Sequence, residues 1–254
     1  MPIYAGIDIG SCTTKAVVID REGNMVGNYV RRSGIDYVGA AREALDIALG
    51  GRAADGMPIV STGYGRHTIP IASEAKTEIS CHARGAFELV RRALTLVDIG
   101  GQDNKVIKLD AQGHRIEFKM NRKCAAGTGT FIEEIAARMN VPLEQLDAMA
   151  RKAQKRIKIG SYCTVFSATE VLSHIRAGVS PGELARGVFE SVVDRVIEMS
   201  SLTAPVVLCG GVVEYNHIIV DIFKERVSGE VILPPHPQLT GAYGAALFAR
   251  ELAG

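Results

Sequence analysis

Two stretches of the sequence, "IDIGSCTTKAVVIDREGN" (residues 7–24) and "VDIGGQDNKVIKLDAQGH" (residues 97–114), align without a gap. Both copies carry apolar alternation together with aspartate, glycine and lysine at matching places. Chance rarely aligns so many polar and glycine positions, and self-similarity of this kind indicates an internal duplication. The matching pairs are Asp8 and Asp98, Gly10 and Gly100, Lys15 and Lys105, Asp20 and Asp110, and Gly23 and Gly113.

Each copy predicts a strand ending in Asp-Ile-Gly, a tight turn, a second strand, another turn and a third strand. Amphipathic helical patterns follow in both halves, and Ser180 before Pro181 is a typical helix start. The predicted fold class is α/β: two related halves, residues 1–94 and 95–254, with a cleft between them. Helices are expected at residues 37–49, 78–93, 127–139, 143–152, 168–177, 181–199, 216–227 and 241–252.

The two Asp-Ile-Gly turns have the composition of phosphate-binding loops. Glycine lets backbone N–H groups approach a phosphate closely. Asp8 and Asp98 together can hold a hydrated Mg²⁺, and Gln102 can orient an attacking water. The expected phosphate-binding residues are Gly10, Ser11, Cys12, Thr13, Thr14 and Lys15 in the first turn and Gly100, Gly101, Gln102 and Asp103 in the second. The alternative is a pair of ordinary β-turns, with Lys15 and Lys105 at the surface.

A third glycine turn, "LCGGVVEYN" (residues 208–216), follows an apolar strand and precedes a helix. Its residues Gly210, Gly211 and Val212 are candidates for contact with an adenine or ribose. Neither GxxxxGK[ST] nor a GxGxxG after a strand occurs in the chain. A P-loop and a dinucleotide-binding fold are therefore disfavoured.

Composition narrows the class of protein. The 254 residues are 47% hydrophobic, the formal net charge is +1, and no basic stripe is present, which argues against nucleic acid as a partner. No signal peptide and no run long enough to span a bilayer is visible, so we expect no membrane association and a cytoplasmic location.

The cysteines pose a separate question. Cys124 in "NRKCAAGTGTF" and Cys163 in "GSYCTVFSATE" each come directly before a predicted helix, whose N-terminus favours thiolate and anionic groups. Read from spacing alone, each is a packing residue or a reactive thiol. The alternative is a 4Fe–4S cluster, which needs four thiolates, and a symmetric dimer would supply two from each subunit. Cys81 and Cys209 fit small buried residues.

The motifs "DIGSCTTK", "DIGGQD" and "CGGV" resemble the phosphate-1, phosphate-2 and adenosine motifs of the actin, sugar-kinase and heat-shock-chaperone ATPase superfamily. The resemblance implies two ribonuclease-H-like domains that close on ATP or ADP. In order along the chain, "TGYGR", "SCHARG", "KCAAGTG", "CTVF" and "PQLTGAYGAAL" further resemble the BadF/BadG/BcrA/BcrD group, and most closely the activators of 2-hydroxyacyl-CoA dehydratases.

That family resemblance implies a function. Cys124 and Cys163 would bind one 4Fe–4S cluster per homodimer, with Gly127, Thr128 and Gly129 among the cofactor-binding residues. Ferredoxin or flavodoxin would supply an electron, and ATP would drive it into a dehydratase or a double-cubane cluster protein. The sequence departs from the family pattern at Cys12, Arg122 and Thr130. The alternatives are a benzoyl-CoA reductase ATPase subunit and a cluster-free sugar or acid kinase.

Overall fold

The chain forms two compact α/β units. The computed structural model describes residues 2–54, 56–121, 128–160 and 164–254. The first unit comprises Met1–Ala93, Leu109–Arg115 and Leu239–Gly254, and the second comprises Leu94–Lys108 and Ile116–Gln238. Each is built on a five-stranded sheet, which confirms the predicted fold class. Among the helices of the described residues, none is long and apolar enough to cross a bilayer.

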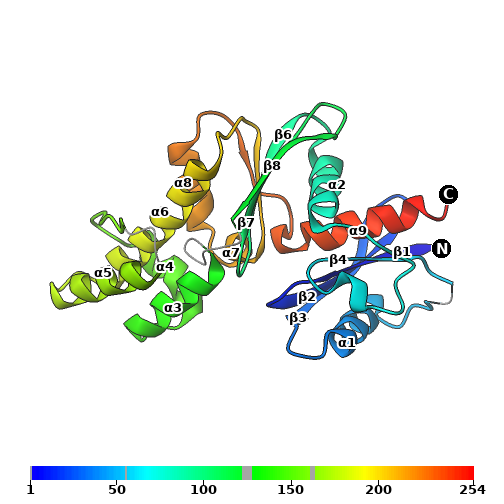
Figure 1. Ribbon diagram of the computed structural model, residues 1–254, viewed down its shortest axis with the longest axis horizontal. Coiled ribbons are helices and arrows are strands. Elements are labelled where there is room, and N and C mark those ends of the chain that lie inside the picture. The colour runs from blue at the N-terminus through cyan, green and yellow to red at the C-terminus, as the bar shows by residue number, and fades with distance from the viewer. Residues whose placement is uncertain (1, 55, 122–127, 161–163) are drawn as a thin grey trace. The chain divides into compact units, whose positions relative to one another are not determined.

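The first sheet has the strand order β3-β2-β1-β4-β5 (Figure 1). Strand β1 pairs antiparallel with β2 and parallel with β4. The first three strands form the predicted meander, because turns rich in Gly and Asp separate three runs of strand-forming residues. The strands are β1 (Ile3–Ile9), β2 (Thr13–Asp20), β3 (Met25–Arg32), β4 (Ile59–Thr62) and β5 (Glu74–Ala75).

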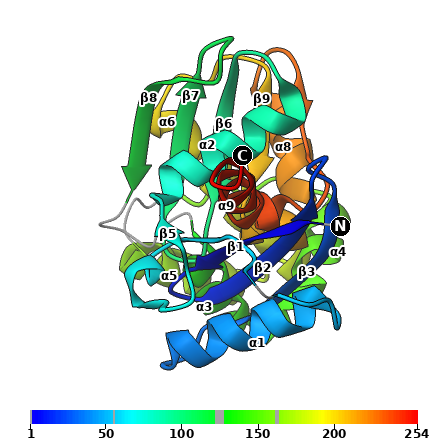
Figure 2. The ribbon, with the colours of Figure 1, turned by 90° about the vertical axis from the view of Figure 1, so that its right-hand side faces the viewer.

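The second sheet repeats the first. Its order is β10-β9-β6-β7-β8, so strands taken in chain order occupy the same places in both sheets (Figure 2). Strand β9 is parallel to β6, as β4 is to β1. The duplication seen in the sequence is thus a duplication of topology. The strands are β6 (Leu94–Ile99), β7 (Asn104–Leu109), β8 (Arg115–Asn121), β9 (Val206–Cys209) and β10 (Val231–Ile232).

The turns between second and third strands explain two of the repeated positions. In both copies the aspartate carboxylate accepts a backbone N–H four residues later, at 2.8 Å from Asn24 to Asp20 and 2.8 Å from His114 to Asp110. The glycines Gly23 and Gly113 have φ of +93° and +84°, which a residue with a Cβ rarely adopts. These residues serve the fold.

Most helices lie within two residues of the predicted ranges. Helices α1 (Tyr37–Leu49) and α6 (Pro181–Met199) have the predicted bounds, and Ser180 forms a capping box with Glu183 at the start of α6. The short α7 (Gly211–Tyr215) and the strands β5 and β10 were not predicted, since two to five residues carry too little periodicity. The other helices are α2 (Glu78–Val90), α3 (Gly129–Met139), α4 (Leu146–Arg151), α5 (Thr164–Arg176), α8 (Ile218–Arg226) and α9 (Thr240–Glu251). Of these, α5 begins four residues earlier than predicted, α2 ends three residues earlier and α4 begins three residues later.

Two layers of helix cover the first sheet, with α1 on one face and α9 on the other (Figure 1). Alternate residues of β2 divide between them: Val18 packs with α1, and Val17 packs with α9. Small residues let α9 approach closely. A Cβ on Gly6 of β1 would lie 2.0 Å from the carbonyl oxygen of Ala242. The C-terminal helix is therefore part of the first unit.

Candidate functional site

The first Asp-Ile-Gly turn is a tight hairpin between β1 and β2. The Gly10 N–H donates to the Thr13 carbonyl at 3.0 Å, and a Cβ on Gly10 would lie 2.9 Å from that oxygen. Asp8 and Lys15 are directly opposite in the antiparallel register, and Lys15 Nζ lies 3.1 Å from Asp8 Oδ2. The carboxylate is buried, and its other oxygen, Oδ1, has no hydrogen-bond partner among the described residues.

The second turn reproduces this geometry. The Gly100 N–H donates to the Asp103 carbonyl at 2.9 Å, and a Cβ on Gly100 would lie 2.9 Å from the same oxygen. Lys105 Nζ lies 3.1 Å from Asp98 Oδ2 and 2.5 Å from Asp103 Oδ1. The side chain of Lys105 is 1% exposed and that of Lys15 is 14% exposed. The alternative that both lysines lie at the surface is therefore wrong, because each neutralises a buried carboxylate.

In the first unit, a glycine directly after β4 lies beside Asp8. Thr62, the last residue of β4, is opposite Asp8 in the parallel register. Gly63 follows with φ +87°, and a Cβ there would lie 2.4 Å from Asp8 Oδ1. The sequence analysis did not include Gly63 among the site residues. The sequence feature that could have identified Gly63 is a glycine directly after a predicted strand, as in "LCGG".

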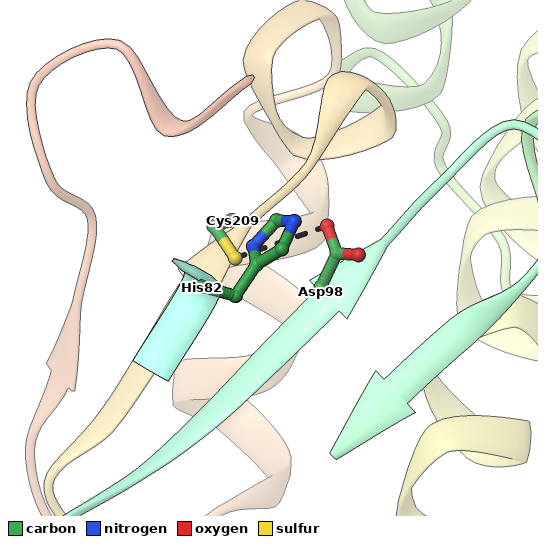
Figure 3. Close-up of side chains that lie close together, drawn as sticks. All are labelled: His82, Asp98 and Cys209. Atoms are coloured by element: carbon green, nitrogen blue, oxygen red, sulfur yellow. Dashed lines mark hydrogen bonds between the residues drawn. The ribbon is translucent and has the colours of Figure 1, made fainter. Parts of the chain in front are cut away.

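The corresponding glycine of the second unit is Gly210, which the sequence analysis did identify. Cys209, the last residue of β9, is opposite Asp98 in the parallel register. Gly210 has φ +100°, and a Cβ there would lie 2.6 Å from Asp98 Oδ1. Figure 3 shows the thiol of Cys209 directed at this carboxylate, with Sγ 3.8 Å from Oδ1. Each unit thus brings an aspartate, a lysine and a left-handed glycine to one strand edge.

The polar side chains of the first turn differ in exposure. Ser11 and Cys12 are exposed and Thr13 is half-buried. Thr14 is fully buried, its Oγ1 lies 2.9 Å from Ser33 Oγ, and Ser33 in turn donates to the Gly10 carbonyl at 2.6 Å. The buried Thr14 hydroxyl therefore stabilises the turn through its contact with Ser33.

The start of α3 is hydrogen-bonded directly to the second turn. The Gly129 N–H donates to the Gly100 carbonyl at 2.9 Å, and the Thr130 N–H donates to the Gly101 carbonyl at 2.8 Å. The Thr130 hydroxyl donates to the same Gly101 oxygen at 2.7 Å. A Cβ on Gly129 would lie 3.1 Å from Gly101 Cα, so a side chain here would crowd the turn. These three hydrogen bonds thus join the second turn to the helix start.

The remaining candidates of the second unit gather at the same place. Val212 Cγ2 would lie 3.2 Å from a Cβ on Gly129, and Gly211 packs on the Gln238 side chain. Thr128 is fully buried at the N-cap position of α3. Gln102 is exposed. The structure therefore brings together Gly100, Gly101, Thr128, Gly129 and Val212 around one turn.

The two candidate cluster ligands, Cys124 and Cys163, lie outside the described residues, as does Gly127. The described residues on either side of them are as follows. Helix α3 begins at Gly129, two residues later than predicted, and α5 begins at Thr164. The Gly160 N–H donates to the Glu170 carboxylate of α5 at 3.1 Å, which ties the segment before Cys163 to the helix after it.

Comparison with known proteins agrees with this geometry. The model of the BadF/BadG/BcrA/BcrD ATPase family matches residues 5–249. An activator of lactoyl-CoA dehydratase from Anaerotignum propionicum is 41% identical over 98% of this chain and 97% of its own. The (R)-2-hydroxyglutaryl-CoA dehydratase component A of Acidaminococcus fermentans has a TM-score of 0.94 at 33% identity, covering 100% of this chain and 99% of that one.

A second solved structure carries a nucleotide analogue. The activator of the 2-hydroxyisocaproyl-CoA dehydratase from Clostridium difficile, with bound ADPNP, has a TM-score of 0.91 at 36% identity. The superposition covers 99% of this chain and 95% of that one. With the family model spanning nearly the whole sequence, the chain belongs to the BadF/BadG/BcrA/BcrD ATPase family.

Proposed function

We propose that the protein is an ATP-dependent activator that passes one electron to a 2-hydroxyacyl-CoA dehydratase or a related double-cubane cluster protein. The observation that carries this proposal is the direct hydrogen bonding between the second Asp-Ile-Gly turn and the start of α3. It connects a phosphate-binding turn to the helix that follows Cys124. The names of the relatives, which are activators of such dehydratases, support the choice of partner.

ATP or ADP is held by the glycine-rich turns. The N–H groups of Gly10 and Gly100 close the two hairpins, so the tips of the turns, at Ser11, Cys12 and Gly101, offer their backbone N–H groups to phosphate oxygens, and Lys15 adds a positive charge. Ser11 and Thr13 offer their hydroxyls, since Thr14 is engaged with Ser33. The segment Gly210, Gly211 and Val212 contacts the adenosine. The ADPNP bound to the Clostridium difficile activator supports nucleotide binding in this chain.

The first turn fits a hydrated Mg²⁺. A buried carboxylate oxygen without a hydrogen-bond donor is costly, and Asp8 Oδ1 is such an atom. Waters on Mg²⁺ would supply the missing donors to Asp8, with Asp98 as the second carboxylate. The ion neutralises phosphate charge when bound. Gln102, whose side chain is exposed, orients the attacking water, and Asp103 contributes by fixing Lys105.

The electron carrier is one 4Fe–4S cluster per homodimer, ligated by Cys124 and Cys163 of each subunit, with ferredoxin or flavodoxin as donor. Sequence supports this assignment, since both thiols precede helix starts and a dimer supplies the four thiolates that a cube needs. Nucleotide binding at the second turn changes the position of the α3 start and thereby of the segment that carries Cys124.

Anaerobic iron analysis with electron paramagnetic resonance tests the proposal. The purified protein should be brown, with about four iron atoms per dimer. Cys124→Ala and Cys163→Ala should each lose the iron and the signal. Cys81→Ala is the matched control, because its thiol is buried in the first unit, and it should retain both. A colourless wild type that hydrolyses ATP would instead place the protein with cluster-free kinases.

Thiol labelling tests the nucleotide site. Burial raises the pKa of Cys81 to about 12, so at pH 8 this thiol is almost wholly protonated and unreactive. Cys12 is exposed in the first turn. We expect iodoacetamide to alkylate Cys12 and not Cys81 under anaerobic conditions, as measured by peptide mass spectrometry. Mg²⁺ and ADPNP should slow the alkylation of Cys12 about tenfold or more, since phosphates would then occupy the first turn. Unchanged labelling would place the phosphates elsewhere.

Thr130 provides a test of the connection between turn and helix. Thr130→Val keeps the side-chain shape and the backbone N–H but removes the 2.7 Å hydroxyl contact with Gly101. A single hydrogen bond contributes about 1 kcal/mol, or about fivefold. We expect ADPNP to protect the first turn of α3 from hydrogen exchange about fivefold less in Thr130→Val than in wild type. Thr130→Ser, which retains the hydroxyl, should match wild type. Equal protection in all three proteins would contradict a role for this contact.

A further inference from the structure

Cys209 has a contact that its sequence environment did not indicate. As expected for a cysteine after "APVVL", it is fully buried at the end of β9. It is also opposite Asp98 in the parallel register, with Sγ 3.8 Å from Asp98 Oδ1 (Figure 3). A thiol is a weak donor, yet a buried carboxylate is a strong acceptor, because hydrogen bonds to charged groups exceed those between neutral groups. The interpretation of Cys209 as a packing residue alone is therefore incomplete.

Two donors approach the two oxygens of the same carboxylate. Lys105 Nζ lies 3.1 Å from Oδ2, and Cys209 Sγ reaches Oδ1. Contacts to both oxygens restrict rotation of the carboxylate about its Cβ–Cγ bond. Gly210 makes this possible, because any side chain there would place its Cβ 2.6 Å from Oδ1. The contacts with Lys105 and Cys209 therefore hold the Asp98 carboxylate in one orientation.

The first unit supplies an internal comparison. Its strand order is the same, and at the register of Cys209 it has Thr62, another small side chain with a donor group. There Lys15 contacts Asp8 Oδ2, while Asp8 Oδ1 has no hydrogen-bond partner in the described part of the chain. The two aspartates are thus equivalent in the fold and different in their contacts. The first leaves an oxygen for a ligand, and the second has a protein donor on each oxygen.

We propose that Cys209 is a positioning residue: its thiol donates to Asp98 Oδ1 and orients this carboxylate for the hydrolysis of ATP. The proposal rests on the proposed function, in which Asp98 is the second carboxylate at the hydrated Mg²⁺. It gives the two aspartates different roles. Asp8 contacts the hydrated ion directly, and Asp98 is the carboxylate that Cys209 orients.

Steady-state ATP hydrolysis provides the first test. Cys209→Ala removes the donor and leaves Asp98 intact. We expect kcat to fall about fivefold, equivalent to about 1 kcal/mol, while KM for ATP stays within about twofold, since the proposed function assigns Cys209 no contact with adenosine or phosphate. Cys81→Ala, which removes a buried thiol from the first unit, should keep the wild-type kcat. A wild-type kcat in a folded Cys209→Ala protein would overturn the proposal.

The S–H stretching band provides a second test that does not depend on catalysis. The infrared difference between wild type and Cys209→Ala isolates the band of this thiol. We expect a low frequency, typical of a hydrogen-bonded S–H, that shifts upward in Asp98→Asn because an amide is a weaker acceptor than a carboxylate. An unshifted band would refute the contact. If wild-type protein neither binds nor hydrolyses ATP, the proposed function fails, and this band alone still decides whether Cys209 orients Asp98.

Discussion

Asp8→Asn will lower the turnover of ATP by about 10²- to 10⁴-fold, the range found when a charged group that acts on the reacting water or phosphate is removed. The substitution keeps the size of the side chain. It removes the negative charge from an atom, Oδ1, that is buried and has no hydrogen-bond partner among the described residues. Because an amide cannot replace a carboxylate as a contact for hydrated Mg²⁺, we expect the loss in kcat and in the dependence of turnover on Mg²⁺.

Phosphate release measured over a range of Mg²⁺ concentrations checks this prediction. Asp20→Asn is the matched control on the same hairpin. Asp20 pairs with Ile3 in the register, at the end of the strands away from Asp8, and accepts hydrogen bonds from Asn24. We expect its kcat to stay within about twofold of wild type, because the affected turn serves the fold. Turnover in Asp8→Asn equal to that in Asp20→Asn would exclude Asp8 from the proposed Mg²⁺ site.

Lys105→Met will destabilise the second unit by about 3 to 5 kcal/mol, the usual cost of leaving a buried charge without its partner. The Lys105 side chain is 1% exposed and contacts two carboxylates, Asp98 at 3.1 Å and Asp103 at 2.5 Å. Methionine fills a similar volume but offers no positive charge, so Asp98 must take up a proton or the strand edge must open. A loss of this size is a large part of the 5 to 15 kcal/mol by which a domain is stable.

Lys15→Met is the matched control in the duplicated unit. Lys15 contacts Asp8 at the equivalent place, but its side chain is 14% exposed. We expect a smaller loss, about 1 to 2 kcal/mol, since Lys15 lies nearer to solvent than Lys105 and water can approach Asp8 where the ammonium group is removed. Pulse proteolysis in urea, with peptides of each unit followed by mass spectrometry, measures both. Equal losses in the two variants would show that the deeper burial of Lys105 has no energetic consequence.

Much of the fold was predictable because it rests on local chemistry. The repeated Asp-Ile-Gly turns, the strand meanders and the bounds of α1 and α6 follow from glycine conformation, apolar alternation and capping residues near one another in the chain. The family was equally accessible, since its motifs are short and contiguous. The short elements β5, β10 and α7 were missed, because they depend on neighbours brought to them by the rest of the fold.

The residues of the candidate site could be chosen from the sequence, but their contacts could not. Glycine and aspartate positions were identified from the repeat, yet the buried pairing of Lys105, the internal role of Thr14 and the participation of Gly63 were not. Each of these depends on which side of a strand faces the interior and on which strand lies alongside. Gly63 is 55 residues from Asp8, and no local pattern connects the two.

The sequence by itself determined that the chain is a duplicated α/β ATPase with two Asp-Ile-Gly turns, because glycine, aspartate and turn geometry are properties of a few consecutive residues. Only the tertiary structure decided how each carboxylate is held. Asp98 meets Cys209 across 111 positions of the chain, and Gly100 and Gly101 meet α3 through backbone atoms that any sequence possesses. Parallel strand pairing and burial create these contacts, and both arise only when distant segments pack together.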